Sequence, residues 1–151
     1  QTGPFLTPVI GSATDPSGTN TTQRANDRPD YAAGYTGNYG NLSGGQSVDQ
    51  WFDRSAFAIP ASNIGRFGYV GPGQLVGPPT ASFSARLVKR IAITEGGNIQ
   101  LEGMSVNLTN TANFANPNLT VTNSNFGKVT STLGVDNGGA RTIQVGARLT
   151  F

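Results

Sequence analysis

The sequence predicts an all-β protein over residues 1–151, with antiparallel strands in hairpins or a meander and long loops rich in Gly, Asn, Ser and Thr. Three observations predict this class. No window keeps apolar residues at the 3.6-residue period of a helix. The chain carries 21 Gly and 9 Pro, which interrupt helices and mark turns. Residues 80–151 contain stretches in which apolar and polar residues alternate, the pattern of a strand with one apolar face. We therefore expect no substantial helix.

We expect a single β domain with three parts. Residues 1–10 form an extended segment, in which Pro4 and Pro8 limit pairing because proline has no amide hydrogen to donate. Residues 11–79 form a long loop region, and residues 80–151 supply the antiparallel strands. A loop of this length is unusual in a compact domain and indicates a function, or a partner that holds it.

Aromatic residues mark two places in the loop region. Tyr31, Tyr35 and Tyr39 are spaced four apart among glycines, so we expect surface contact residues on a loop rather than a helical stripe. Trp51–Pro60 is dense in aromatics and is expected to anchor the loop to the body of the protein. Residues 67–79 are rich in turn-forming Gly and Pro and leave little room for regular structure.

The first long strand is expected within residues 81–94, where Lys89 and Val88 alone break the alternation. One face carries Phe83, Ala85, Leu87, Ile91 and Ile93, and the other carries Ser82, Ser84, Arg86, Arg90 and Thr94. Glu95–Asn98 predicts a hairpin turn. The return strand opens at Ile99, and its apolar residues change phase beyond Gly103, which predicts a β-bulge there.

The last strand has the clearest pattern in the chain. Before it, we expect a loop from Asn107, a strand through residues 128–130 and a second tight turn at residues 136–139. In residues 140–151, apolar and polar side chains then alternate without a break, and the apolar set is Ile143, Val145, Ala147, Leu149 and Phe151. A strand of roughly 9–11 residues is long enough to cross a bilayer at a tilt.

Composition excludes several classes of function. The chain has no Cys and no His, which removes disulfides, thiolate metal sites, cysteine nucleophiles and serine triads. Its net charge is only +2 and its basic residues are scattered, so we expect no nucleic-acid partner. We therefore expect a protein that is not an enzyme, with no catalytic, cofactor-binding or metal-binding residues.

The carboxylates and asparagines are expected to serve structure. Turn or cap duty is the better account of Asp15, Asp27, Asp30, Asp49 and Asp53, and nothing fixes the separation of a catalytic pair that would include Glu95 or Glu102. Residues 15–18 and 136–139 offer too few oxygen ligands for calcium. Surface glycosylation stays open at the Asn-x-Ser/Thr triplets that begin at Asn20, Asn41, Asn107 and Asn118.

Several runs of residues resemble a known family. They are Trp51-Phe52-Asp53 with Ala56-Phe57 and Pro60; Phe67-Gly68, Gly71, Leu75 and Gly77-Pro78; Leu87 with Lys89; Glu102, Asn107, Asn110, Asn113-Phe114 and Asn116-Pro117; and Asn125 to Ser131. In order and spacing these runs resemble the C-terminal portion of the Oar-like TonB-dependent receptors of the carboxypeptidase-regulatory-like family. Residues 1–8 and 15–18 resemble the strand end and loop that precede it, and residues 146–151 are similar to the terminal signal of outer-membrane barrels.

The resemblance implies a large, plugged barrel in the bacterial outer membrane, powered through TonB by parts of the receptor outside this chain. Met104, Val106, Leu108 and Thr109 stand where the family carries aromatics, which weakens the expected aromatic girdle. A plugged transporter barrel has about 22 strands, whereas this chain offers three or four and leaves two open edges. The sequence names no ligand and no symmetry. It also leaves open whether the chain is a standalone subunit, and whether Gln1 arises by signal cleavage or from a longer receptor.

Two hypotheses follow from those open edges. In the first, the chain is an exported structural protein, extracellular or on the cell surface, that assembles into a filament by pairing strands with copies of itself. Residues 1–10 would then be the strand passed to a neighbour. The residues expected to pair or pack in such an assembly are Phe5, Val9, Trp51, Phe57, Ile143, Val145, Leu149 and Phe151.

In the alternative, the strands are the end of an outer-membrane TonB-dependent transporter barrel, and the partner is the rest of that barrel. Residues 11–79 would then be an extracellular loop. The two hypotheses differ in what covers the apolar strand faces, which is hydrocarbon in the barrel and protein in the filament.

Overall fold

The structure is a computed structural model that describes the whole chain except residues 1, 13, 20–26, 94 and 136–137. It confirms the all-β prediction, since the named strands pair antiparallel and the described residues contain no α-helix; the named helical element is a single 3-10 turn, Arg54–Ala56. The chain divides into two compact units. We call residues 80–114 with 132–151 the sheet unit, and residues 2–79 with 115–131 the loop unit.

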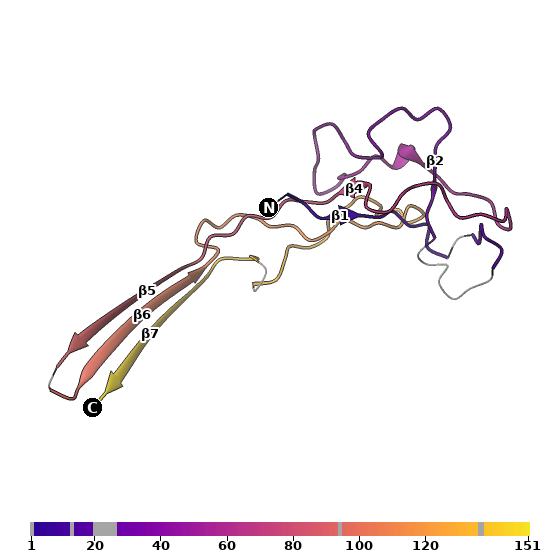
Figure 1. Cartoon of the computed structure of the whole chain (residues 1–151). Coiled ribbons are helices and arrows are strands. Elements are labelled where there is room, and N and C mark those ends of the chain that lie inside the picture. Colours follow the sequence, from indigo (N-terminus) through magenta and orange to yellow (C-terminus); the bar gives the residue numbers. More distant parts are fainter. Residues whose placement is uncertain (1, 13, 20–26, 94, 136–137) are drawn as a thin grey trace. The chain divides into compact units, whose positions relative to one another are not determined.

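The sheet unit is built on three long strands in the order β5-β6-β7 (Figure 1). They are β5 (Ala85–Ala92), β6 (Asn98–Val106) and β7 (Thr142–Thr150). The predicted hairpin turn joins β5 to β6, where the Ile93 amide donates to the Gly97 carbonyl at 2.9 Å.

Two sequence predictions about strands are wrong. The β6 ladder runs through Gly103 without a bulge, because Gly103 pairs with Leu87 on one side and Val145 on the other. The change of phase arises because Met104 and Val106 are apolar residues on the other face of the same regular strand. Residues 128–130 form no strand, since their amides bond to scattered partners, such as Val129 to the Val48 carbonyl at 2.7 Å.

Two buried asparagines hold together the segments that enter and leave the sheet. The Asn107 amide donates to the carbonyls of Thr111 (2.9 Å) and Gly139 (2.6 Å), and its oxygen accepts from the Thr111 amide at 3.1 Å. The Asn113 side chain bonds both the amide (2.7 Å) and the carbonyl (2.9 Å) of Ala81. A carboxamide has donors and an acceptor, so it can satisfy backbone groups that no ladder reaches. The second predicted turn ends here, although its residues 136 and 137 lie outside the described residues.

The loop unit has two very short strand pairs and a small apolar core. β1 (Phe5–Leu6) pairs with β4 (Leu75–Val76), and β2 (Asp30–Tyr31) pairs with β3 (Phe57–Ala58). The buried cluster draws on both segments of the unit and consists of Leu6, Phe52, Ala56, Phe57, Val70, Leu75, Val121 and Phe126. Phe57 meets the edge of Phe126 with ring centroids 5.7 Å apart. The predicted loop region therefore folds around aromatic residues of the Trp51–Pro60 segment.

Two of the three evenly spaced tyrosines, Tyr31 and Tyr35, pack against the buried cluster instead of lying on the surface. Tyr31 stacks on Phe57 at 6.2 Å, and both Tyr31 and Tyr35 pack against the buried cluster. The Tyr35 hydroxyl accepts a hydrogen bond from the Gly40 amide at 3.2 Å. Only Tyr39, with 55% of its surface exposed, is a surface residue. The prediction of surface contacts was wrong for two of the three, because the aromatic cluster that they pack on is assembled by distant segments.

One ion pair fastens the β2 end of the loop unit. Arg66 donates to both oxygens of Asp30, at 2.9 and 2.7 Å, and the Tyr69 amide adds a third bond at 2.9 Å. The Arg66 guanidinium also lies 4.0 Å from the centroid of the Tyr69 ring. The hydrogen bonds from Arg66 lower the pKa of Asp30 below its usual value, against a smaller opposing effect of burial.

Candidate functional site

The main surface feature of the sheet unit is an apolar face whose large side chains are mostly exposed. Directly paired residues lie on the same face of a sheet, so each row across the three strands can be followed from the register. One row is Leu87, Gly103 and Val145, and the row two residues along is Lys89, Leu101 and Ala147. Six large side chains on this face are exposed, and Ile99 is half-buried. The exposed fractions of the six are 78% for Leu87, 42% for Ile91, 43% for Leu101, 64% for Ile143, 87% for Val145 and 58% for Leu149.

The opposite face of the same sheet is polar and carries an ion pair. Arg86 donates to both carboxylate oxygens of Glu102, at 2.7 and 2.8 Å, and Arg90 donates to Gln100 at 3.2 Å. Arg148 of β7 lies in register with Gln100. The sheet is therefore mainly apolar on one side, whereas its charged and amide side chains gather on the other, as predicted for Arg86 and Arg90.

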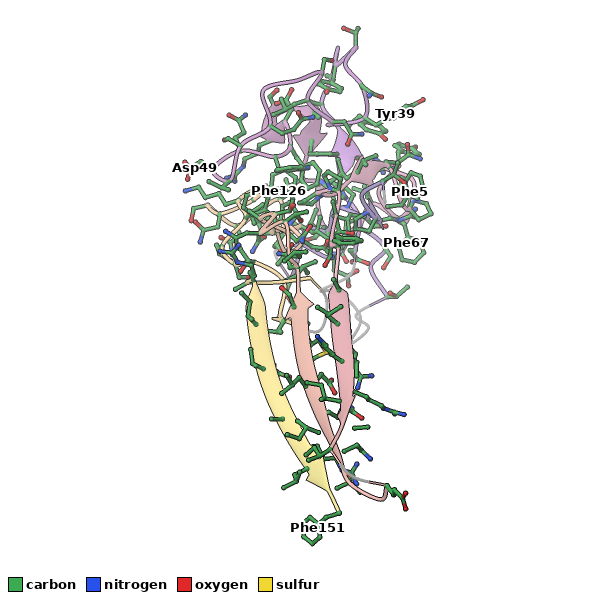
Figure 2. The ribbon with its side chains drawn as sticks, turned by 90° about the vertical axis from the view of Figure 1, so that its left-hand side faces the viewer. Phe5, Tyr39, Asp49, Phe67, Phe126 and Phe151 are labelled. Carbon is green, nitrogen blue, oxygen red and sulfur yellow. The ribbon has the colours of Figure 1, made fainter. Side chains whose placement is uncertain are left out.

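The height of the apolar face fits a lipid bilayer. Phe83 and Ile93 continue the alternation of β5 at its two ends. Phe151 continues that of β7 and lies at the far end of the strand (Figure 2). The ten residue-to-residue steps from Phe83 to Ile93 extend about 33 Å along a strand. At a strand tilt of about 40° this spans roughly 25 Å, the height of the outward apolar band of an outer-membrane barrel. Aromatic side chains stand at both ends of the band, at Phe83 and at the fully exposed Phe151.

Two residues depart from this pattern. Lys89 is the one charged side chain on the apolar face of the described strands, and its long aliphatic stem allows the ammonium group to reach toward the Ile93 end of the band. Ser105 is 8% exposed, and its hydroxyl has no hydrogen-bond partner among the described residues. Neither departure breaks the band, because their row neighbours on β7, Ala147 and Ile143, are apolar.

Both edges of the sheet are open. Among the described residues β5 and β7 each pair with β6 alone, so the outer amides and carbonyls of two long strands have no strand beside them. In hydrocarbon, every backbone polar group needs a partner within the protein. A sheet of this kind requires further strands on both sides before it can sit in lipid.

The residues expected to pair or pack in an assembly fall into two groups. Ile143, Val145, Leu149 and Phe151 lie together on the exposed apolar face of β7. The other four belong to the loop unit, where Phe57 is buried, Trp51 and Val9 are half-buried and Phe5 is 78% exposed. Their role in assembly stays a prediction.

The N-terminal segment, expected to be passed to a neighbour, is paired within its own chain. Phe5 and Leu6 form a ladder with β4, and Val9 bonds through its amide to Leu119 at 2.9 Å and through its carbonyl to Val121 at 2.8 Å. These bonds occupy part of the backbone groups that strand donation would use.

Of the aspartates predicted to serve turns or caps, Asp15 and Asp53 do so, whereas Asp30 lies in β2 and pairs with Arg66. Asp15 accepts from Ser17 and Gly18 in a turn, and Asp53 caps the 3-10 helix through the Ser55 amide at 2.9 Å. The described residues contain no group of three or more His, Cys, Asp or Glu side chains that could hold a metal ion.

Three of the four asparagines that begin candidate glycosylation triplets lie among the described residues. Asn107 is buried, the Asn41 and Asn118 side chains bond to backbone groups, and Asn20 lies outside the described residues.

Among the described residues, no helix is both long and apolar enough to cross a membrane.

The chain matches the family model of the outer membrane beta barrel domain over residues 1–144. The chain belongs to this family. Membership places it in the bacterial outer membrane, and it accounts for the two-faced sheet, because barrel strands alternate between lipid-facing and interior-facing side chains. No curated protein and no solved structure shows significant similarity to the chain.

Proposed function

We propose that β5, β6 and β7 are the C-terminal strands of a transporter barrel in the outer membrane, of the Oar-like TonB-dependent type, and that the chain has no enzymatic role. The observation that carries this proposal is the apolar face, which is mostly exposed, about as tall as the hydrocarbon band and backed by a polar face. The family match supports the barrel, and the sequence resemblance supports the transporter type. The partners are the other strands of the barrel, which would pair with the free edges of β5 and β7.

The connections between strands orient the sheet. In bacterial barrels the periplasmic turns are short and the extracellular loops are long. The β5–β6 turn spans residues 93–97, whereas residues 107–141 separate β6 from β7 and residues 2–84 precede β5. The short turn and Phe151 would therefore face the periplasm, and the loop unit, which is built from the long segments, would lie outside the cell.

The filament hypothesis stays a prediction. It requires the same apolar face to be covered by protein instead of lipid, and it gives no reason for the match between strand length and bilayer thickness. The pairing of residues 5–9 within the chain also leaves fewer backbone groups for exchange between copies.

A labelling experiment tests the barrel and its orientation. The chain has no cysteine, so each single cysteine introduced is a unique probe. Spin labels at Val145 and, as a matched control on the opposite face, at Gln144 are compared in outer-membrane vesicles. We expect the label at position 145 to collide with lipid-soluble oxygen and the label at 144 with a water-soluble nickel complex. Equal exposure of both labels to the water-soluble reagent would refute a lipid-facing sheet.

Orientation is read separately. Ser47→Cys in the loop unit should react with a large, membrane-impermeant maleimide polymer on intact cells. Glu95→Cys in the short turn should react only after the outer membrane is permeabilised. The opposite result would overturn the assigned orientation.

A further inference from the structure

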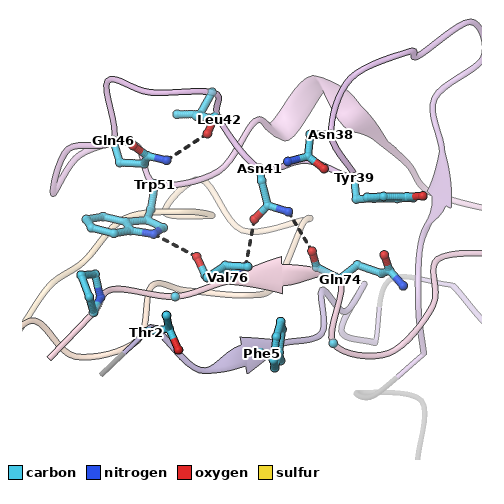
Figure 3. Close-up of a pocket in the computed structure, with 14 residues that line it drawn as sticks. Thr2, Phe5, Asn38, Tyr39, Asn41, Leu42, Gln46, Trp51, Gln74 and Val76 are labelled. Carbon is cyan, nitrogen blue, oxygen red and sulfur yellow. Dashed lines mark hydrogen bonds between the residues drawn. The ribbon is translucent and has the colours of Figure 1, made fainter.

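We propose that the loop unit binds a neutral oligosaccharide in a pocket of about 770 Å³ formed beside β1 and β4 (Figure 3). This inference adds a ligand to the proposed function. It depends on that function in one respect only, that the loop unit faces the exterior of the cell. The pocket lies wholly within the loop unit, and its volume falls in the range of ligand-binding clefts.

Three aromatic side chains line the pocket. Trp51 and Tyr39 stand on either side of Asn41, and Phe5 lies below it in the view of Figure 3. Phe5 and Tyr39 are 78% and 55% exposed, so these rings are open to a ligand rather than packed in the core. The electron-rich face of an aromatic ring attracts the polarised C–H groups on one side of a sugar ring.

Side-chain amides supply the polar groups of the pocket. Asn38 and Gln74 line it, and neither side chain has a hydrogen-bond partner among the described residues. Gln46 donates to the Leu42 carbonyl at 2.9 Å, which leaves its oxygen as an acceptor. Each amide offers donors and an acceptor side by side, and a sugar hydroxyl is itself both donor and acceptor. The set is therefore matched to a ligand with many hydroxyl groups.

The lining carries no carboxylate, lysine or arginine. A charged ligand brought against these aromatic and amide groups would lose hydration without gaining an opposite charge, which is unfavourable. The pocket chemistry thus selects an uncharged ligand.

An extended peptide fits this pocket less well than a sugar, because the accessible strand edge is already occupied. Asn41 donates to the Gln74 carbonyl at 2.8 Å and accepts from the Val76 amide at 2.9 Å, so that its side chain takes the place of a neighbouring strand. The Trp51 indole donates to the Val76 carbonyl at 3.2 Å. A peptide that adds to a sheet needs those backbone groups free.

The single tryptophan makes the test direct, because Trp51 lines the pocket and is the only indole in the chain. The full chain, kept soluble in a mild detergent, is titrated with maltohexaose and with cellohexaose while its tryptophan emission is recorded. Hexagalacturonate, of similar length but negatively charged, is titrated in parallel. We expect a saturable change with at least one of the neutral sugars and a much weaker response to the charged one.

Variants locate the response. Tyr39→Ala and Gln74→Ala remove a ring and an amide that lie outside the buried cluster, although Tyr39 also contacts the Tyr31 ring (centroids 6.2 Å apart). Each substitution is expected to weaken binding by roughly tenfold. Phe67→Ala is the matched control, since Phe67 is also an exposed aromatic of the loop unit (57%) but does not line the pocket. It should bind as the unaltered chain does.

The absence of a saturable response to both neutral sugars would overturn the inference, as would equal binding of hexagalacturonate or equal weakening by Phe67→Ala. A response only to peptides would also overturn it. Failure here is distinguishable from failure of the barrel proposal, because the labels at positions 144 and 145 report lipid exposure whether or not a sugar binds.

Discussion

Val145→Arg is the substitution that most directly probes what covers the sheet. Val145 lies on the apolar face of β7 in a central row with Gly103 and Leu87, and 87% of its surface is exposed in the chain alone. If this face meets lipid, an arginine at position 145 would be held near the middle of the hydrocarbon.

The expected cost follows from two contributions. Arginine on the lipid face of a barrel costs about 2–4 kcal/mol near the bilayer centre. Replacing the valine also removes the free energy gained by transferring its side chain out of water, about 1.5 kcal/mol or more. We expect the free energy of unfolding to fall by about 3.5–5.5 kcal/mol, which raises the unfolded-to-folded ratio by roughly three to four orders of magnitude.

The measurement is urea unfolding of the barrel that carries this sheet, refolded into lipid vesicles and followed by the mobility of folded and unfolded bands on unheated gels. Gln144→Arg is the matched control, because it introduces the same side chain one residue away on the polar face. We expect it to change stability by no more than about 0.5 kcal/mol.

Equal destabilisation by the two arginines would refute this argument, since it would show that the two faces of β7 meet similar surroundings. So would an unchanged stability for Val145→Arg, because an arginine at that depth in lipid cannot be neutral.

Three further predictions concern the rest of the chain. Gly40→Ala should destabilise the loop unit by about 1–3 kcal/mol in thermal unfolding, because a Cβ there would strike a core phenylalanine ring, whereas Gly34→Ala shares the positive φ but has open space around it and should cost less. Asp30→Asn should remove the acid-induced loss of stability that Asp30 causes. Hydrogen bonds from Arg66 lower the pKa of Asp30 in the folded state, so its stabilising contribution is present above the unfolded pKa of about 3.9 and is lost as pH falls through the folded pKa. A circular-dichroism titration with acid measures the difference between the two chains. Asn113→Ala should cost about 1–3 kcal/mol and increase amide exchange in residues 80–82, and unchanged exchange there would contradict the role given to this side chain.

The long strands could be predicted from the sequence because their signal is local. β7 alternates over nine residues without interruption, and the two exceptions noted in β5, Val88 and Lys89, fall on the faces that the alternation assigns to them. Gly103 shows where local pattern fails. Met104 and Val106 are apolar residues on the polar face, and a change of apolar phase does not distinguish that arrangement from an inserted residue.

The short pairs and the pocket could not be predicted in the same way. β1 and β4 contribute two residues each, too few for a period, and Leu6 meets Leu75 only because the chain between them folds back. The pocket depends on Asn41, whose amide reaches Gln74 and Val76 more than thirty residues away. The sequence marked Trp51 and Phe5 as contact residues, but no local signal showed that they would line one pocket.

The way the loop unit is assembled along the chain has a consequence for the order of folding. Its two segments, residues 2–79 and 115–131, flank the β5–β6 hairpin in sequence, and contacts such as the bond from Thr122 to the Ile10 carbonyl close a loop of more than a hundred residues. Closure of so long a loop is slow, and the contacts that reward it form only after the ends have met. The first segment must therefore wait for the hairpin and the second segment before Phe126 can cover its side of Phe52 and Phe57. We expect a chaperone of the export route to shield Phe52 and Phe57 during that interval.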